Sequence, residues 1–259
     1  MANELLFERR GHVALLTLNR PEVHNAMNAA LQQQIREAWA NFLADPELRV
    51  AVITGAGDKA FSAGADLKAI AGRSAGDFLD EFWHHSYNRT LPQVWKPVVA
   101  AINGYCYAAA LNLVCTHADI RIASERATFS YAEIRRGFSG YAAAAAILPR
   151  QIPYAFAMEW LLTGKVVDAQ TALRHGFVAE VVAHDRVLER ALEIAGKVAE
   201  LAPLATRGVK EAAWRGLSLD IARSARYAEA IGTLARLTED AREGPRAFVE
   251  KRRPRYKGS

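Results

Sequence analysis

The stretch Ala60-Phe61-Ser62-Ala63-Gly64-Ala65-Asp66-Leu67-Lys68, together with Lys96-Pro97-Val98-Val99-Ala100-Ala101-Ile102-Asn103-Gly104, decides how this chain is interpreted. Each stretch couples a small-residue turn to a buried apolar strand. Small residues let a ligand carbonyl approach the main chain closely, and paired backbone N–H donors stabilise a developing oxyanion. The two stretches therefore predict two N–H groups that face one another at a small site.

The composition is ordinary for a soluble globular protein. Hydrophobic residues make up 51% and charged residues 24% of the 259 residues, enough to bury a sizeable core. No apolar run is long enough to cross a bilayer, and the N-terminus lacks the pattern of a secretory signal. Cys106 and Cys115 both lie in apolar surroundings, so we expect reduced, packed thiols and a cytoplasmic location.

The formal net charge of +5 suits either nucleic acid or a small anionic ligand as partner. The densest basic cluster is the run 251–257, which begins at Lys251. No nucleic-acid-binding motif accompanies it, so nucleic acid is not the favoured partner. The run is interpreted either as a solvated tail or as a contact for a phosphate-bearing small ligand.

Short apolar strands alternate with helices over the first 185 residues. We expect a long helix over 29–44, and strands over 12–18, 49–55, 97–102, 119–124 and 177–182. This alternation is typical of an α/β fold with right-handed crossovers. Beyond Asp185 only helices are expected, with Asp185 and Ser218 as N-caps, over 187–201, 204–215, 219–237 and 242–251. Residues 1–185 are thus predicted to be an α/β core and residues 186–259 a helical oligomerisation segment.

The stretch Gly55-Ala-Gly57-Asp-Lys-Ala60 follows a predicted strand with the spacing of a dinucleotide-binding fingerprint. That fingerprint needs a helix to begin there, with its N-terminus on the pyrophosphate. Residues 61–66 instead have the composition of another turn. A nicotinamide site is therefore not favoured.

A helix that starts near Ala109 would direct its positive end toward whatever precedes it. An N–H at that helix start and an N–H near Ala65 would together hold a thioester oxygen as it gains enolate charge. From the residues alone, the alternative is a strand, a tight turn and a buried helix whose small residues only permit close packing.

Several motifs in combination identify a family. They are Leu18-Asn-Arg-Pro with Asn25-Ala26, residues 61–68, residues 96–104, Asp119-Ile-Arg-Ile-Ala, Leu162-Thr-Gly164 and Ala172 through Gly176-Phe-Val. With these, nearly the whole chain resembles the enoyl-CoA hydratase/isomerase (crotonase) family. The resemblance implies a crotonase-like spiral of ββα repeats, a C-terminal all-helical trimerisation segment, and trimers or dimers of trimers. It also implies an acyl-CoA thioester as substrate, with coenzyme A as part of that substrate and no separate cofactor.

By this resemblance, Ala65 and Ala109 match the two positions whose N–H groups form the oxyanion hole. The positions that line the nucleotide and pantetheine path match Val23, Ala26, Ala63, Asp66, Leu67 and Lys68. We expect basic residues near Lys68 and the tail around Lys251 to meet the coenzyme A phosphates, the tail across a subunit boundary. The Cys and His residues do not have metal-ligand spacing, so no metal site is expected.

Hydratases of this family normally use two carboxylates, one to activate water and one to deliver or remove the α-proton. The second position matches Glu133, which we expect to be the main acid/base. Ser130 and Glu133 also have the spacing of a capping box, so a purely structural role for Glu133 is the alternative.

The first carboxylate position falls on Asn112. An amide cannot act as a general base at neutral pH, so we expect Asn112 to orient water or substrate instead. One residue more than usual separates Asn112 from Asp119, which leaves Leu113 as the competing occupant of this position.

Two further departures concern the turn and the acyl pocket. The usual glycine-rich turn is Ala108-Ala109-Ala110, whose methyl groups narrow the site and make positive φ costly. Residues 137–141, which run into five alanines, replace a turn rich in proline and glycine. His84 and His85 lie in the segment that commonly shapes the acyl pocket, and we expect them to be packed or solvated rather than basic catalysts.

The sequence therefore predicts an enoyl-CoA hydratase-like lyase that hydrates or dehydrates a 2-enoyl-CoA through an enolate held in an oxyanion hole. The runner-up is a double-bond isomerase that uses Glu133 alone. A third interpretation, of another class, is a non-catalytic relative that binds acyl-CoA or RNA. No membrane partner is expected.

Overall fold

Three successive units, each of two strands and a helix, form the centre of the chain. The structure is a computed structural model that describes residues 3–72, 74, 76–77, 94–139 and 143–259. The units are β3 (Val50–Gly55), β4 (Ala60–Ser62) and α2 (Leu67–Ala71); β5 (Val98–Ile102), β6 (Tyr105–Tyr107) and α4 (Ala109–His117); and β7 (Ile120–Ser124), β8 (Thr128–Ser130) and α5 (Ala143–Gln151). This is the ββα repeat that the family resemblance implied.

The first strand of each unit enters a six-stranded sheet. Its order is β1-β2-β3-β5-β7-β10, where the outer strands are β1 (Leu5–Arg10), β2 (Val13–Leu18) and β10 (Glu180–Val182). All neighbouring strands run parallel except β1 and β2. The strands expected from apolar runs are therefore present, and each ends within three residues of its expected bounds.

The second strand of each unit enters a smaller sheet of order β4-β6-β8-β9, in which β9 (Val167–Asp168) is the edge. β4, β6 and β8 run parallel, and β9 runs antiparallel to β8. The two sheets share the same three units, so successive crossovers place the carboxyl ends of β4, β6 and β8 at one edge.

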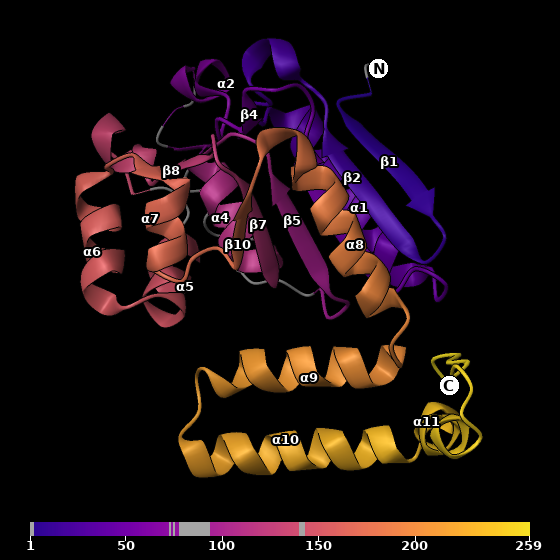
Figure 1. Cartoon of the computed structure of the whole chain (residues 1–259). Coiled ribbons are helices and arrows are strands. Elements are labelled where there is room, and N and C mark those ends of the chain that lie inside the picture. The colour runs from indigo at the N-terminus through magenta and orange to yellow at the C-terminus, as the bar shows by residue number, and fades with distance from the viewer. Residues whose placement is uncertain (1–2, 73, 75, 78–93, 140–142) are drawn as a thin grey trace.

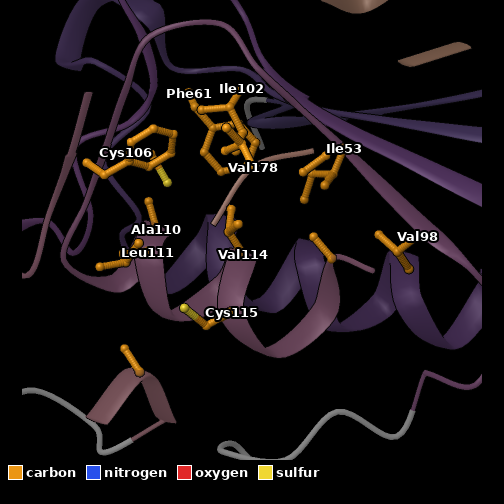
Figure 2. Close-up of a cluster of buried hydrophobic side chains, with 14 of the residues drawn as sticks. Ile53, Phe61, Val98, Ile102, Cys106, Ala110, Leu111, Val114, Cys115 and Val178 are labelled. Carbon is orange, nitrogen blue, oxygen red and sulfur yellow. The ribbon is translucent and has the colours of Figure 1, made fainter. Parts of the chain in front are cut away.

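Helices cover both faces of the six-stranded sheet (Figure 1). On one face, α8 (Val187–Ala199) packs its buried residues Val187, Ala191, Ala195 and Ala199 against β3, β5 and β7. The other face contacts α1 (Ala29–Ala44) and α4. Figure 2 shows Ala110, Val114 and Cys115 of α4 with Ile53 and Ile102 from this sheet. The buried side chains of α4 therefore hold this helix against one face of the sheet.

The remaining core helices connect these layers. They are the short 3-10 turns η1 (Pro21–Val23), η2 (Ala132–Arg136) and η3 (His184–Arg186), with helices α6 (Tyr154–Thr163) and α7 (Ala169–Arg174). In the described ranges, no helix is long and apolar enough to cross a membrane.

The last three helices are α9 (Pro203–Gly216), α10 (Ile221–Arg236) and α11 (Glu239–Val249). α9 and α10 form a pair below the sheets (Figure 1), and neither buries a residue in this chain. Lys210 of α9 joins the pair to the body through a 2.7 Å contact with Asp119. The division expected at residues 185 and 186 stays a prediction, with α8 lying on the sheet of the first part.

The basic C-terminal run is held against α11. The carboxylate of Asp240, which is buried, accepts the N–H groups of Lys257 and Gly258 at 2.7 and 2.8 Å. Arg252 binds both carboxylate oxygens of Glu243 at 2.6 and 2.9 Å. The run is therefore tied to α11, while Lys251, Arg253, Arg255 and Lys257 remain exposed to solvent, as the interpretation as a solvated tail expected.

Both expected N-caps were wrong. Asp220, not Ser218, caps α10 by accepting the N–H of Arg223 at 2.9 Å. Asp185 lies inside η3, and α8 begins after Arg186 with no side-chain cap. The glycine motif at Gly55 is followed by strand β4, so no helix is available there for a pyrophosphate. Residues 61 and 62 belong to that strand rather than to the expected turn.

Candidate active site

Three candidate residues follow three neighbouring strands of the smaller sheet. Ala65 comes after β4, Ala109 after β6 and Glu133 after β8, each within three residues of the strand's end. Because these strands are parallel neighbours, their carboxyl ends meet at the same edge of the sheet. That edge is where ligands commonly bind in open α/β sheets. The topology therefore brings the three residues to one place.

The backbone around Ala65 is bound to the neighbouring loop on either side of that residue. The N–H of Met27 donates to the carbonyl of Gly64 at 2.8 Å, and the N–H of Asp66 donates to the carbonyl of Met27 at 3.0 Å. Within the described residues, the N–H of Ala65 has no acceptor. A buried or half-buried N–H of this kind is normally paired, so it points to a ligand oxygen.

The turn before α4 has an unusual backbone. Ala108 has φ 53° and ψ −121°, a conformation that glycine adopts at low cost and alanine does not. The N–H of Ala108 donates to the carbonyl of Ser130 at 2.9 Å. Ala109 is the first residue of α4, so its N–H has no acceptor within the helix. The strained turn exposes this donor.

Gly64 brings the two turns into contact. A β-carbon at Gly64 would lie 2.7 Å from the β-carbon of Ala108 and 3.1 Å from the nitrogen of Ala109. Gly64 also has φ 95°. Only glycine meets both requirements without displacing the backbone. The N–H groups of Ala65 and Ala109 thus belong to two turns that touch.

Glu133 lies in η2 with only 5% of its surface exposed. Its Oε1 accepts a hydrogen bond from Asn112 at 3.1 Å, and its Oε2 has no partner in the described part of the chain. Burial raises the pKa of this carboxyl to about 7, against the hydrogen bonds from its own backbone and from Asn112. A carboxyl with a pKa near neutrality can both take and give a proton.

Asn112 lies in the first turn of α4 and faces Glu133. Its Nδ2 donates to Glu133 Oε1 and to the carbonyl of Ala108, the latter at 3.3 Å. Its Oδ1 accepts the N–H of Ala144 at 2.7 Å. Leu113, the competing occupant, packs against the hydrophobic core. Asn112 is therefore the residue that the fold directs toward the carboxyl group.

The capping box considered for Ser130 and Glu133 does not form. The hydroxyl of Ser130 donates to the carbonyl of Gly164 at 2.7 Å. η2 begins after Tyr131 without a side-chain capping bond. The capping-box interpretation of Glu133 was therefore wrong, and its role as acid/base stays a prediction.

Two groups at this site were not predicted from the sequence. The hydroxyl of Tyr131 is buried without a partner among the described residues, and burial with the nearby Glu133 raises its pKa to about 12. The N–H of Ala144 holds Asn112. The N–H of Ala144 is a backbone donor whose position depends on where α5 lies, so no residue type reveals it. The aromatic ring of Tyr131, two residues before Glu133, would have been a usable clue.

Comparison with known proteins gives the family. The sequence profile of a family described as enoyl-CoA hydratase/isomerase matches residues 8–259. The chain belongs to this family. The range matched by the enoyl-CoA hydratase/isomerase family includes both the two sheets and the C-terminal helices.

Individual relatives agree over full length. (E)-Benzylidenesuccinyl-CoA hydratase of Thauera aromatica is 37% identical over 97% of this chain and 98% of its own. Carnitinyl-CoA dehydratase of Citrobacter koseri is 37% identical over all of both chains. The solved enoyl-CoA hydratase from Bacillus anthracis has a TM-score of 0.93 at 33% identity, covering 99% of this chain and 100% of that one. The protein is accordingly an enoyl-CoA hydratase-like enzyme, a lyase that acts on an acyl-CoA thioester.

The residues expected along the coenzyme A path of this enoyl-CoA hydratase-like enzyme lie on two adjoining loops and the helical turns that flank them. Val23 and Ala26 lie at and after the end of η1, and Ala63, Asp66, Leu67 and Lys68 lie between β4 and the start of α2. The N–H of Ala63 donates to the carbonyl of His24 at 2.9 Å, and Arg20 lies 3.3 Å from the carboxylate of Asp66. Asp66 is thereby tied to the opposite loop, while Leu67 and Lys68 stand exposed. The two loops are held as one surface.

Within one chain, Lys251 does not lie beside these two loops. It follows α11, at the opposite end of the molecule from α2 (Figure 1). His84 and His85 fall outside the described residues, so their expected place stays a prediction. Among the residues that the structure describes, no group of three His, Cys, Asp or Glu side chains could hold a metal ion.

Proposed function

We propose that the enzyme adds water to, or removes it from, an acyl-CoA thioester, with Glu133 as its acid/base and the N–H groups of Ala65 and Ala109 as its oxyanion hole. The observation that carries this proposal is Glu133 Oε2, a buried carboxyl oxygen without a partner among the described residues, on a group with pKa about 7. It is linked through Asn112 to the turn that presents Ala109.

Hydration needs only one carboxylate, because the proton that Glu133 takes in the first step is returned in the last. Ionised Glu133 accepts a proton from water as the water oxygen bonds to Cβ of the enoyl group. The electron pair of the double bond moves into the thioester, whose oxygen receives hydrogen bonds from Ala65 and Ala109. Glu133 then gives the proton to Cα, and the enolate collapses to the 3-hydroxyacyl thioester. Dehydration is the reverse.

The choice of hydration is supported by the names of the relatives, a hydratase and a dehydratase. Asn112 in place of the first carboxylate favours the second candidate, double-bond isomerisation, in which Glu133 moves a proton between two carbons. Isomerisation needs no water oxygen in the product, so the two reactions are separable by isotope.

The test is turnover of a panel of 2-enoyl-CoA and 3-enoyl-CoA thioesters in ¹⁸O-labelled water and in deuterated water, read by mass spectrometry. Heavy oxygen in the product is the result expected. A moved double bond with deuterium but without heavy oxygen would establish isomerisation instead. Glu133→Gln should lower kcat/KM by about 10²- to 10⁴-fold. The matched control is Glu125→Gln, an exposed carboxylate outside the site, and it should not change turnover.

We infer that coenzyme A lies along the two joined loops, with Lys68 near a phosphate and Lys251 supplied by a neighbouring subunit. Support comes from the exposed position of Lys68 and from the distance of Lys251 within one chain. Salt should weaken binding through both residues because exposed charges are screened.

We also infer that the active form is a trimer or a dimer of trimers, assembled through the helices after α8. Large apolar side chains of α9, α10 and α11 are exposed in the single chain. A cytoplasmic setting is supported by Cys106 and Cys115, which are free and buried.

A further inference from the structure

The Asn112 amide has a single favourable orientation. Its Nδ2 faces two acceptors, the carboxyl oxygen of Glu133 and the carbonyl of Ala108, at 3.1 and 3.3 Å. Its Oδ1 faces a donor, the N–H of Ala144, at 2.7 Å. Rotating the amide by half a turn would oppose oxygen to two acceptors and nitrogen to a donor. Both N–H bonds of Asn112 are therefore committed to the protein.

This orientation makes the two oxygens of Glu133 unequal. Oε1 faces an N–H, so it acts as an acceptor whether Glu133 is ionised or protonated. When the carboxyl is protonated, the proton is accordingly placed on Oε2, which is buried and has no partner in the described ranges. The titratable group beside it is Tyr131, whose hydroxyl is likewise buried without a described partner.

We propose that Asn112 is a positioning residue that holds Glu133 Oε1 as a fixed acceptor and makes Oε2 the atom through which protons move. The inference rests on the proposed function of Glu133. It narrows the expectation that Asn112 orients water, because neither N–H of the amide is left to donate to one and only the second lone pair of Oδ1 could accept from one.

The chemical consequence concerns one oxygen atom. Oε2 takes the proton from water as the C–O bond forms, and the same Oε2 returns a proton to Cα as the enolate collapses. Asn112 neither gains nor loses a proton in either step. Its amide keeps the plane of the Glu133 carboxyl fixed from the first step to the second. One lone pair of Oε2 can therefore serve both the water that attacks Cβ and the carbon Cα.

The experiment follows the Glu133 carboxyl directly, by ¹³C NMR of protein labelled at the Glu side-chain carboxyl carbon, with Glu133→Gln used to assign the signal. Asn112→Asp keeps the acceptor for Ala144 but replaces the donor with a like charge. In this variant, the pKa of the Glu133 signal should rise by at least about one unit. Asn112→Ala, which only removes the donor, should raise it by about half a unit to one unit.

The matched control is Thr116→Val. Thr116 lies one turn further along α4, and its hydroxyl donates to the carbonyl of Asn112 at 2.8 Å without touching Glu133. This variant loosens the same helix and should leave the Glu133 pKa in place. If the pKa in both Asn112 variants moves no more than in Thr116→Val, the inference is wrong.

Infrared difference spectra below pH 6 show which oxygen of protonated Glu133 accepts the hydrogen bond from Asn112. If Oε1 is the carbonyl oxygen that accepts from Asn112, the C=O stretch of protonated Glu133 should shift to higher wavenumber in Asn112→Ala. An unchanged band would overturn the assignment. Both readouts are independent of turnover. If Glu133→Gln is inactive but neither Asn112 variant changes the pKa or the infrared band of Glu133, only this inference is refuted. Full activity in Glu133→Gln would refute the proposed function itself.

Discussion

At the active site polar atoms are buried without partners, whereas on the C-terminal helices apolar side chains stand in solvent. Oε2 of Glu133 and the hydroxyl of Tyr131 have no partner among the described residues. Ile221 of α10 and Phe248 of α11 are 88% and 86% exposed. Both arrangements are costly, since a buried polar group without a hydrogen bond costs about 1–3 kcal/mol and a large exposed apolar patch favours association.

The difference matches what the two proposals require. At the proposed site, a bound thioester and water would supply hydrogen bonds to these atoms. In the proposed trimer, another chain would cover the apolar side chains of the helices. Substitutions at the active site should therefore change the stability of the single chain, whereas substitutions on the exposed faces of the helices should change assembly, and the four predictions below test this in order of expected effect.

The largest effect is expected where the helical pair meets the body. Lys210 is largely buried and lies 2.7 Å from Asp119, and desolvation lowers the pKa of Lys210 and raises that of Asp119. Lys210→Met removes the cation from the Asp119 carboxylate, whose side chain is 30% exposed, and the donor from the carbonyl of Lys96. The free energy of unfolding should fall by about 3 kcal/mol, measured by urea denaturation.

The control for this prediction is Arg223→Met. Arg223 of α10 forms an exposed pair with Asp220 at 3.3 Å. An exposed pair contributes little, so the change should stay within about 0.5 kcal/mol. Equal losses in the two variants would mean that α9 is held by general packing rather than by its buried ion pair.

The second prediction concerns Glu133. Its pKa in the folded chain is about 7 against an ordinary 4.5, so the folded state binds the proton more tightly than the unfolded state. Stability should therefore fall as pH rises from about 4.5 to 7 and then level off. Glu133→Gln removes this penalty and should stabilise the protein by about 2 kcal/mol at pH 8.

At about pH 3.5 and below, both states carry the proton and the same variant should have little effect on stability. Thermal unfolding of both proteins across this pH range measures the difference. A variant that is less stable than the parent at pH 8 would contradict the assignment of Glu133 as a buried, poorly solvated carboxyl. The catalytic loss should occur at every pH.

The third prediction concerns the strained turn before α4. Ala108 has φ 53° and ψ −121°, which costs an alanine about 1–3 kcal/mol. Ala108→Gly relieves this strain but increases the entropy of the unfolded chain, so the net gain should be about 1 kcal/mol.

The neighbouring variant Ala110→Gly provides the control. Ala110 is buried inside α4, where glycine costs about 1 kcal/mol relative to alanine. The same substitution two residues apart should therefore change stability with opposite signs. Parallel losses in both variants would show that Ala108 is not strained.

The smallest effect on a single chain is expected at Phe248. Phe248→Asp removes an exposed aromatic group, so the folding free energy of the dissociated chain should change by less than about 0.5 kcal/mol. The mass in sedimentation velocity should instead fall to that of one chain. Leu6→Asp, at an exposed apolar residue of β1, is the control and should keep the larger mass. A single-chain mass before substitution would refute the proposed trimer.

The sequence predicted the long elements well and the short ones poorly. The apolar runs at 49–55 and 97–102 became β3 and β5 because buried parallel strands are continuously apolar. β6 and β8 have three residues each, too few for any period to be visible. Their pairing depends on contacts between units, which local pattern does not contain.

The same limit applies to the site. Family resemblance located Ala65, Ala109, Asn112 and Glu133, and their residue types and positions identified the turns and the carboxyl group. It did not show how the Asn112 amide is held, because two of its partners, the carbonyl of Ala108 and the N–H of Ala144, are backbone atoms. Backbone partners of this kind follow from the placement of α5, which the sequence pattern leaves open.

The alternation of strands between two sheets has a consequence for how such enzymes diverge. One ββα unit supplies Ala65, the next supplies Ala109 and Asn112, and the third supplies Glu133. If these residues act as proposed, the binding of the thioester and the proton chemistry are encoded in separate stretches of the gene. A lineage can alter the third unit, and with it the reaction, while inheriting an unchanged hold on the common part of its substrates.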